Sequence, residues 1–167
     1  MSDPWGLEGA TVAITGASTG IGAALTDAFL DSGAIVLGIS RSPDKHPTTS
    51  PNYRTYAADL SVRSETEALI DALKADHERI DVLINNAGHA LRAPSVNYPM
   101  DDWDRLIELN LTAPFLLSRG LAPPMLHRGA GKVIFTASLW SFLGGRSVPA
   151  YTVTKSGIAG MIRALSN

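Results

Sequence analysis

A glycine-rich segment, TGASTGIG at residues 15–22, ends the apolar run TVAIT and opens an amphipathic stretch. Glycine at position 16 permits a tight strand-to-helix turn, and glycines at 20 and 22 let the backbone approach a pyrophosphate. The free N–H groups and positive dipole end of the helix would face that phosphate. The plain alternative is a glycine-rich turn without a ligand; no GK[ST] follows, so the segment is not a nucleoside-triphosphate P-loop. The candidate phosphate-binding residues are Gly16, Ser18, Thr19, Gly20, Ile21 and Gly22.

Short apolar runs alternate with amphipathic stretches along the whole chain. Strands are predicted over residues 11–15, 34–40, 54–58, 81–85 and 132–137. Helices are predicted over residues 20–32, from 101 or 102 to about 111, and over 151–165. Fully apolar strands that alternate with helices indicate a parallel sheet covered on both faces. With right-handed crossovers this predicts an α/β, doubly wound parallel sheet, a Rossmann fold, in which ligands bind at the carboxyl ends of the strands.

Local signals refine three boundaries. Residues 41–53, rich in proline, serine and threonine, are predicted to form a loop. Ser64 and Glu67 have the spacing of a capping box, and the apolar positions 68, 69, 72 and 73 then supply one face of a helix. A further helix carries Phe115 to Leu121, and we expect Pro123 and Pro124 to kink or end it.

Length and composition limit the classes of protein that remain. A chain of 167 residues is predicted to be one domain, and its formal charge of −2 gives no reason to expect a nucleic-acid partner. The absence of cysteine excludes disulfides, thiolate metal sites and a cysteine nucleophile, and the four histidines are scattered, so no metal site is predicted. No secretion signal and no apolar run of membrane-spanning length is visible, which predicts a soluble, cytoplasmic protein without a membrane partner.

The residues that follow the second, third and fourth strands are candidates for contact with a dinucleotide. At Ser40-Arg41, where an NAD site normally has a carboxylate for the ribose 2′-OH, the sequence offers a cation instead. This favours the 2′-phosphate of NADP, with NAD still possible and a solvated loop arginine as the alternative. Asp59 and Leu60 are placed to meet the adenine ring, although a plain turn aspartate is as reasonable. The run Asn86, Ala87 and Gly88 either lies beside the cofactor or forms only a turn.

Tyr151 and Lys155 are four residues apart, so they share one helix face. An ammonium near a phenol stabilises the phenolate and lowers the phenol pKa from its usual value of about 10. Tyr151 could then exchange a proton with a substrate oxygen near neutral pH, and Ser138, just past the fifth strand, could hydrogen-bond the same oxygen. A Tyr–Lys pair at this spacing arises by chance often enough to be weak alone; its order after the glycine turn makes it informative.

Taken together, these motifs resemble those of the short-chain dehydrogenase/reductase family over essentially the whole chain. The resemblance implies a catalytic tetrad of Asn110, Ser138, Tyr151 and Lys155. Tyr151 would be the general acid in reduction and the general base in oxidation, and Ser138 would orient the carbonyl. Lys155 would hold the nicotinamide ribose and tune Tyr151, and both residues would also contact the cofactor. Asn110 would shape a helix kink and hold a proton-relaying water; a plain helix-terminal asparagine is the alternative.

Two departures from the family pattern bear on cofactor and completeness. NADP-preferring relatives often have a basic residue just before the glycine at 20, where this chain has Thr19. The family's sheet also continues with two further strands and a substrate loop, whereas this sequence stops at Asn167, just after the predicted catalytic helix. The resemblance therefore implies one NAD(P)-binding domain over residues 1–167, truncated after that helix, whose fifth strand would leave an apolar edge.

The activity implied is NAD(P)-dependent hydride transfer between a ketone and a secondary alcohol, with a small-molecule carbonyl or alcohol as substrate. The stretch SLWSFLGG at 138–145 loosely resembles gluconate and deoxygluconate dehydrogenases, and a 3-oxoacyl-type substrate is also considered. His89 and Trp140 could line the pocket, and Arg92 or Arg146 could meet a substrate carboxylate, although structural or solvated roles are at least as reasonable. The competing hypotheses are an inactive NAD(P)-binding fragment, a redox-sensing subunit, and a sugar-nucleotide epimerase. Helices around residues 110–128 and 151–167 resemble the family's oligomer surface, which implies a homodimer or homotetramer.

Overall fold

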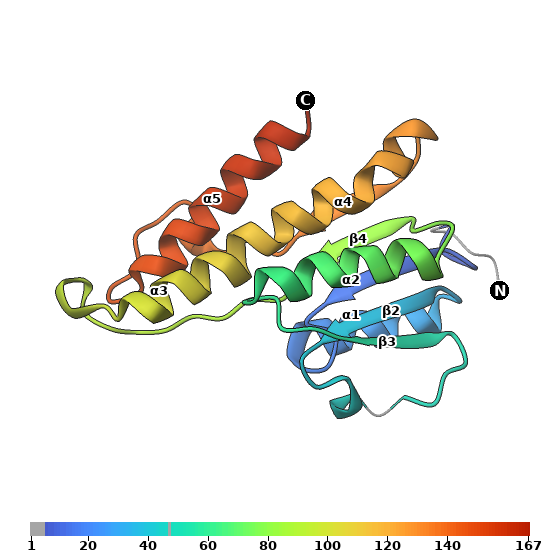
Figure 1. The fold of residues 1–167 in the computed structure, drawn as a ribbon, viewed down its shortest axis with the longest axis horizontal. Helices are drawn as coiled ribbons and strands as arrows, with labels where there is room; N and C mark the ends of the chain where they lie inside the picture. Colours follow the sequence, from blue (N-terminus) through green and yellow to red (C-terminus); the bar gives the residue numbers. More distant parts are fainter. Residues whose placement is uncertain (1–5, 47) are drawn as a thin grey trace.

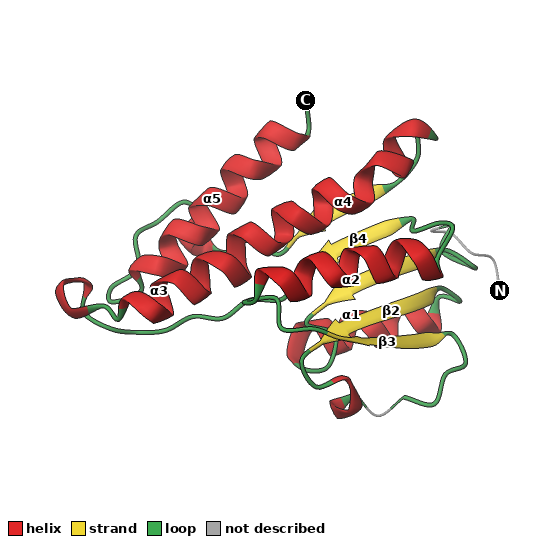
Figure 2. Cartoon of the chain, viewed as in Figure 1, coloured by secondary structure: helices red, strands yellow, loops and turns green. Residues whose placement is uncertain are grey.

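A computed structural model describes residues 6–46 and 48–167 of the chain. Its centre is a five-stranded parallel sheet in the order β3-β2-β1-β4-β5 (Figures 1 and 2). The strands are β1 (Thr11–Thr15), β2 (Ile35–Ser40), β3 (Tyr53–Ala57), β4 (Val82–Asn85) and β5 (Lys132–Phe135). The chain moves outward from β1 to β3 and then crosses to β4, so the topological switch point lies between β1 and β4. Ligands of doubly wound sheets bind beyond such a point.

Helices cover both faces of the sheet, as predicted. Helix α1 (Gly20–Asp31) packs Leu25 and Phe29 against one face. Helices α2 (Arg63–Asp76) and α4 (Ala113–His127) pack together on the opposite face, where Leu73 and Leu117 are fully buried (Figure 1). Burial of two apolar layers is what holds the sheet between them.

Helices α3 (Met100–Ile107) and α4 are joined by a π-helical turn, η3 (Glu108–Thr112), so the helical path runs on from Met100 to His127. Of the kink or end predicted at Pro123 and Pro124, the end is wrong, because both residues lie inside α4, which ends at His127. The prolines remove two backbone donors, yet Leu121 and Met125 on either side of them are buried in the core, and this packing keeps the segment helical.

The predicted capping box at the start of α2 is also wrong. The helix begins at Arg63 with Val62 at the N-cap position, and no side chain caps it. Ser64 lies within the first turn, and Glu65 rather than Glu67 reaches backward, accepting a hydrogen bond of 2.7 Å from the Asp59 N–H. The Glu65 carboxylate therefore satisfies a backbone N–H group of the segment between β3 and α2, not one at the start of the helix.

The remaining boundaries differ from the prediction by a few residues. Strand β3 starts at Tyr53, which the sequence assigned to the preceding loop, and β5 ends at Phe135, two residues early. The loop after β2 contains a short 3-10 helix, η1 (Pro43–Lys45), and two others are η2 (Ser95–Asn97) and η4 (Leu139–Ser141). Helix α5 (Pro149–Leu165) starts two residues before Tyr151, because proline is well suited to the first helical position. No described helix is both long enough and apolar enough to cross a bilayer.

Candidate active site

The glycine turn between β1 and α1 has the geometry that the sequence predicted. Gly16 and Gly20 adopt positive φ angles of 69° and 56°, a region that residues with a Cβ rarely occupy. A Cβ on Gly22 would overlap the Gly16 carbonyl oxygen, so the helix can approach the turn only with glycine there. The N–H groups of Gly16 and Ala17 donate to the Ile39 carbonyl at 2.8 and 3.2 Å. The turn is thus attached to β2 as well as β1.

Thr15, the last residue of β1, joins the glycine turn to the end of β4. Its Oγ1 accepts hydrogen bonds of 2.9 Å from the backbone N–H groups of both Asn86 and Ala87. The Asn86 side chain donates in return to the Thr15 carbonyl at 3.1 Å. Sequence reasoning missed Thr15 because it treated the residue as the end of an apolar strand. The available signal was the Thr15 hydroxyl group itself, because a polar side chain at the end of a buried apolar strand needs hydrogen-bond partners.

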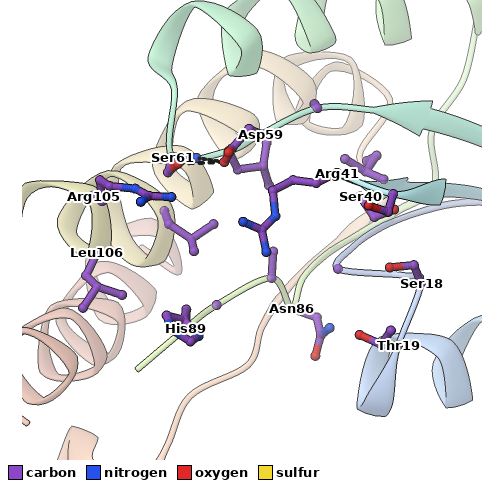
Figure 3. Close-up of a pocket in the computed structure, with 18 of the residues that line it drawn as sticks. Ser18, Thr19, Ser40, Arg41, Asp59, Ser61, Asn86, His89, Arg105 and Leu106 are labelled. Carbon is purple, nitrogen blue, oxygen red and sulfur yellow. Dashed lines mark hydrogen bonds between the residues drawn. The ribbon is translucent and has the colours of Figure 1, made fainter. Parts of the chain in front are cut away.

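A cavity of about 540 Å³ opens beyond the carboxyl ends of β1, β2 and β3 (Figure 3). Most of the predicted cofactor residues line it: Gly16, Ser18, Thr19, Ile21, Ser40, Arg41, Asp59, Leu60, Asn86, Ala87 and Gly88. Gly20 and Gly22 do not line it and act by shaping the turn. The cavity also includes residues that the sequence analysis did not select, namely Ser42, Lys45, Ser61, Asp102, Arg105 and several apolar side chains.

The charged groups of this cavity come from three different elements. Figure 3 shows Arg41, after β2, and Arg105, from α3, reaching into the cavity. Partial burial raises the pKa of Asp59, but hydrogen bonds from the Ser61 hydroxyl and N–H, at 2.7 and 3.0 Å, together with the two arginines lower it on balance. Asp59 is therefore an anion at neutral pH, held in a fixed orientation at the cavity wall.

A second cavity of about 430 Å³ contains Tyr151 and Lys155 and shares Ile21, Asn86, Gly88 and His89 with the first. The Lys155 Nζ donates a hydrogen bond of 2.6 Å to the Thr136 carbonyl and lies 5.7 Å from the centre of the Tyr151 ring. Lys155 is almost fully buried, and burial lowers the pKa of its ammonium group. The two residues thus share a helix face, as their spacing predicted, and line a cavity that adjoins the larger one.

Asn110 is buried in the π-helical turn η3 and fixes the loop after β4. Its Oδ1 accepts from the His89 N–H at 2.9 Å, and its Nδ2 donates to the His89 carbonyl at 2.8 Å. The Nδ2 also lies 3.3 Å from the hydroxyl of Thr154, next to Lys155. A Cβ on Gly88 would lie 3.2 Å from Asn110 Oδ1, so glycine leaves room for this close approach. The contact with His89 was not predicted, because it joins residues 21 apart.

Ser138 caps the short helix η4 and lines neither of these two cavities. Its Oγ accepts a hydrogen bond of 3.3 Å from the Trp140 N–H, while its own N–H donates to the Ser141 hydroxyl at 3.2 Å. Since a hydroxyl that accepts can still donate its proton, Ser138 retains a donor for a ligand. The structure therefore brings Asn110, Tyr151 and Lys155 together and places Ser138 on the adjacent β5–α5 connection.

The fold and these cavities define a class: a doubly wound dinucleotide-type domain with a Tyr–Lys pair at the switch point. The model of the family described as short chain dehydrogenase matches residues 10–167. The chain belongs to this family of NAD(P)-dependent oxidoreductases, as its motifs predicted.

Relatives with named activities are similar over the whole chain. A 2-dehydro-3-deoxy-D-gluconate 5-dehydrogenase from Pseudoalteromonas atlantica is 38% identical over 100% of this chain and 69% of its own length. The solved structure of a metagenomic short-chain oxidoreductase in complex with NADP is 33% identical, with a TM-score of 0.90 over 98% of this chain and 75% of that one. A gluconate 5-dehydrogenase from Burkholderia cenocepacia, solved with NADP and tartrate, is 29% identical, with a TM-score of 0.84 over 95% of this chain and 65% of that one.

Two consequences follow from these similarities. The chain spans about two thirds of the length of the curated relatives that it matches. The prediction of NADP as cofactor agrees with the NADP present in both of those structural neighbours, and NAD remains open.

Proposed function

We propose that this chain carries the cofactor site and the catalytic tetrad of an NADP-preferring dehydrogenase that interconverts a secondary alcohol and a ketone in a sugar acid. The observation that carries the proposal is the continuity of the two cavities. Ile21, Asn86, Gly88 and His89 line both, so a dinucleotide in the larger cavity would end beside Tyr151 and Lys155.

The residues of the larger cavity fit a dinucleotide phosphate. Gly16 and Gly22 bring the backbone close enough to the start of α1 for its free N–H groups to meet a pyrophosphate, since side chains at these positions would clash. Arg41 offers its guanidinium where NAD-binding relatives of this fold offer a carboxylate. Asp59 and Leu60 form the wall for the adenine ring. When bound, the nicotinamide nucleotide supplies or accepts the hydride.

In this proposal the tetrad residues move and hold protons. The Tyr151 hydroxyl gives its proton to the substrate oxygen in reduction and takes it back in oxidation. The Ser138 hydroxyl donates to the same oxygen and orients it. Lys155 holds the nicotinamide ribose, with its ammonium group 5.7 Å from the centre of the Tyr151 ring. Asn110 fixes the loop at His89 and the π-helical turn, and thereby positions a water that relays protons from Lys155.

A sugar acid is favoured as substrate class by the names of relatives that are similar over the whole chain. Four of them, 31 to 38% identical to this chain, are 2-dehydro-3-deoxy-D-gluconate 5-dehydrogenases. Other relatives of comparable identity have different names, including a D-threitol dehydrogenase and a nodulation protein, so the fold alone does not select the substrate.

The test is a turnover assay, following NADPH absorbance, with gluconate, 5-ketogluconate, 2-dehydro-3-deoxygluconate and a 3-oxoacyl thioester as substrates. Turnover of a sugar acid with NADP, greater than with NAD, is the expected result. Turnover of the thioester alone would overturn the substrate class. NADPH binding without turnover of any substrate would favour a non-catalytic binding role.

A further inference from the structure

The cofactor cavity contains a second cation from the loop after β2. The glycine turn itself offers no cation to the cavity, because its residues from Gly16 to Gly22 are uncharged. In the structure Lys45, at the end of η1, lines the cavity together with Arg41 and Ser42. Lysine and arginine thus stand four residues apart on one short loop at the end of β2.

We propose that Lys45 is the second cation for the cofactor 2′-phosphate, and that the buried ring of His46 holds it in place. This inference rests on the proposed NADP site and names the residues that select the 2′-phosphate within it. Lys45 would contact the phosphate, whereas His46 is a positioning residue that acts through Lys45.

The charge requirement supports a second cation. A phosphate monoester has a charge of about −1.5 to −2 near neutral pH. Among the described residues that line the cavity, the carboxylates are Asp59 and Asp102, and the cations are Arg41, Lys45 and Arg105. Asp59 already contributes to balancing Arg41 and Arg105, since both lower its pKa. Lys45 therefore supplies positive charge that the arginines alone would not offer to a dianion.

His46 attaches this loop to helix α1. Its side chain is only 5% exposed, although Lys45 beside it is exposed to solvent. The Nε2 atom lies 3.2 Å from Asp27 Oδ1 of α1 but has no aligned hydrogen-bond partner among the described residues. The contact is therefore a close approach of the two side chains without hydrogen-bond alignment.

His46 also packs edge-on against Tyr53 of β3, with ring centres 5.3 Å apart at 66°. Tyr53 lies over Gly38 of β2, where a Cβ would overlap its hydroxyl group, and it packs against the apolar core on the α1 face. This explains a glycine in the middle of a buried strand. The loop is consequently held at both ends, by β2 before Arg41 and by His46 after Lys45.

The experiment measures the affinities of NADPH and NADH by nicotinamide fluorescence for the wild type and Lys45→Gln. The matched control is Lys74→Gln, an exposed lysine on α2 outside the cavity. Loss of one charge-assisted contact is expected to weaken NADPH binding about five- to tenfold, with NADH binding unchanged and the control equal to the wild type. Adenosine 2′,5′-bisphosphate, titrated by calorimetry, should show the same loss without the nicotinamide half.

The positioning role is tested with His46→Ala in both the wild-type and the Lys45→Gln backgrounds. Because His46 acts through Lys45, we expect about a threefold loss of NADPH affinity in the first background and none in the second. Asp27→Asn changes the contact with His46 without leaving a cavity, and we expect it also to lower the affinity for NADPH in the wild-type background. This variant keeps the test decisive if His46→Ala fails to fold.

The outcomes separate the two proposals. An unchanged NADPH-to-NADH ratio in Lys45→Gln would overturn this inference while leaving the NADP site intact. Equal losses from His46→Ala in both backgrounds would overturn the positioning role. A wild type that binds neither nucleotide, or binds NADH more tightly, would overturn the proposed cofactor and this inference with it.

Discussion

The strands beneath the glycine turn and strand β5, which leads to helix α5 and its Tyr–Lys pair, are packed very differently. Val12, Ala13 and Ile14 of β1 are completely buried between two helical layers, whereas Ile134 of β5 is 43% exposed at the sheet edge. Thirteen large apolar side chains are exposed among the described residues, and seven of them lie in the segment from β5 to Asn167. These seven are Ile134, Leu139, Phe142, Leu143, Val153, Ile162 and Leu165. We call strands β1 to β4 with helices α1, α2 and α4 the nucleotide side, and the segment from β5 through α5 the catalytic side of the proposed site. Helices cover the sheet on the nucleotide side, whereas the catalytic side presents apolar surface to solvent.

This difference indicates where stability and chemistry reside. Buried apolar area is the main favourable term in folding, so β1, β2 and β4 with helices α1, α2 and α4 contribute most of it. The segment from β5 through α5 holds Ser138, Tyr151 and Lys155 against that body. Substitutions on the nucleotide side should therefore affect the fold, and those on the catalytic side should affect the reaction.

The largest effect is expected from Tyr151→Phe, which removes only the hydroxyl group. If Tyr151 is the acid and base, turnover falls about 10³-fold, the affinity for NADPH changes far less than turnover, and thermal stability stays as in the wild type. Steady-state kinetics with the substrate of the panel above that the wild type turns over, the fluorescence titration and thermal unfolding measure these effects. A variant that kept full turnover would remove Tyr151 from the mechanism.

Gly22→Ala tests the nucleotide side. The added methyl group would overlap the Gly16 carbonyl, so we expect a loss of about 2–4 kcal/mol in unfolding free energy and weaker binding of both nucleotides. The matched control is Gly160→Ala in α5, where the nearest atom to a new Cβ is an Arg163 nitrogen at 3.9 Å. Because alanine favours helix over glycine, this change should be neutral or stabilising by up to about 1 kcal/mol. Equal effects at both positions in urea denaturation would contradict the comparison.

Amide hydrogen exchange should separate the two regions without any substitution. Amides of β1 lie between two paired strands under buried helices, whereas in the described part of the chain β5 pairs with β4 alone. We expect β1 amides to exchange at least about tenfold more slowly than those of β5, because local opening is cheaper at a thinly covered edge. Strand β3, at the opposite edge of the sheet, is measured in the same experiment as a second edge strand. Equal protection of the β1 and β5 amides would refute the difference in packing.

The smallest effect concerns the pH dependence of stability at Lys155. Burial lowers the pKa of its ammonium below the ordinary 10.5, so the unfolded chain binds the proton more tightly than the folded one. This penalty is fully present below the folded pKa and is relieved as pH rises toward 10.5. Lys155→Met should therefore raise the melting temperature at neutral pH. The melting temperature of this variant should also increase less between neutral and alkaline pH than that of the wild type. Turnover should be abolished. A melting temperature that fell by the same amount at every pH would show that the ammonium stabilises the fold.

Much of this architecture was predictable because its signals are local. The boundaries of β1 and the start of α1 at Gly20 follow from a five-residue apolar run and the glycines after it, and the pairing of Tyr151 with Lys155 follows from helical periodicity. The errors were local signals overruled by packing. Pro124 stays within α4 because its neighbour Met125 is buried. Ser64 does not cap α2 because the helix already begins at Arg63, with Val62 at the N-cap position.

The sequence by itself determined the sheet class and the glycine turn, because each depends on residues only a few positions apart. The tetrad is a prediction that rests on the order of motifs and on the family resemblance that this order carries. Only the tertiary structure placed Arg105 and Lys45 in one cavity, bound Asn86 to Thr15 and attached His89 to Asn110. These contacts join residues from 21 to 71 positions apart. They form because parallel strands end at the same edge of the sheet and bring distant residues together there. A local sequence pattern does not predict which of these residues come into contact.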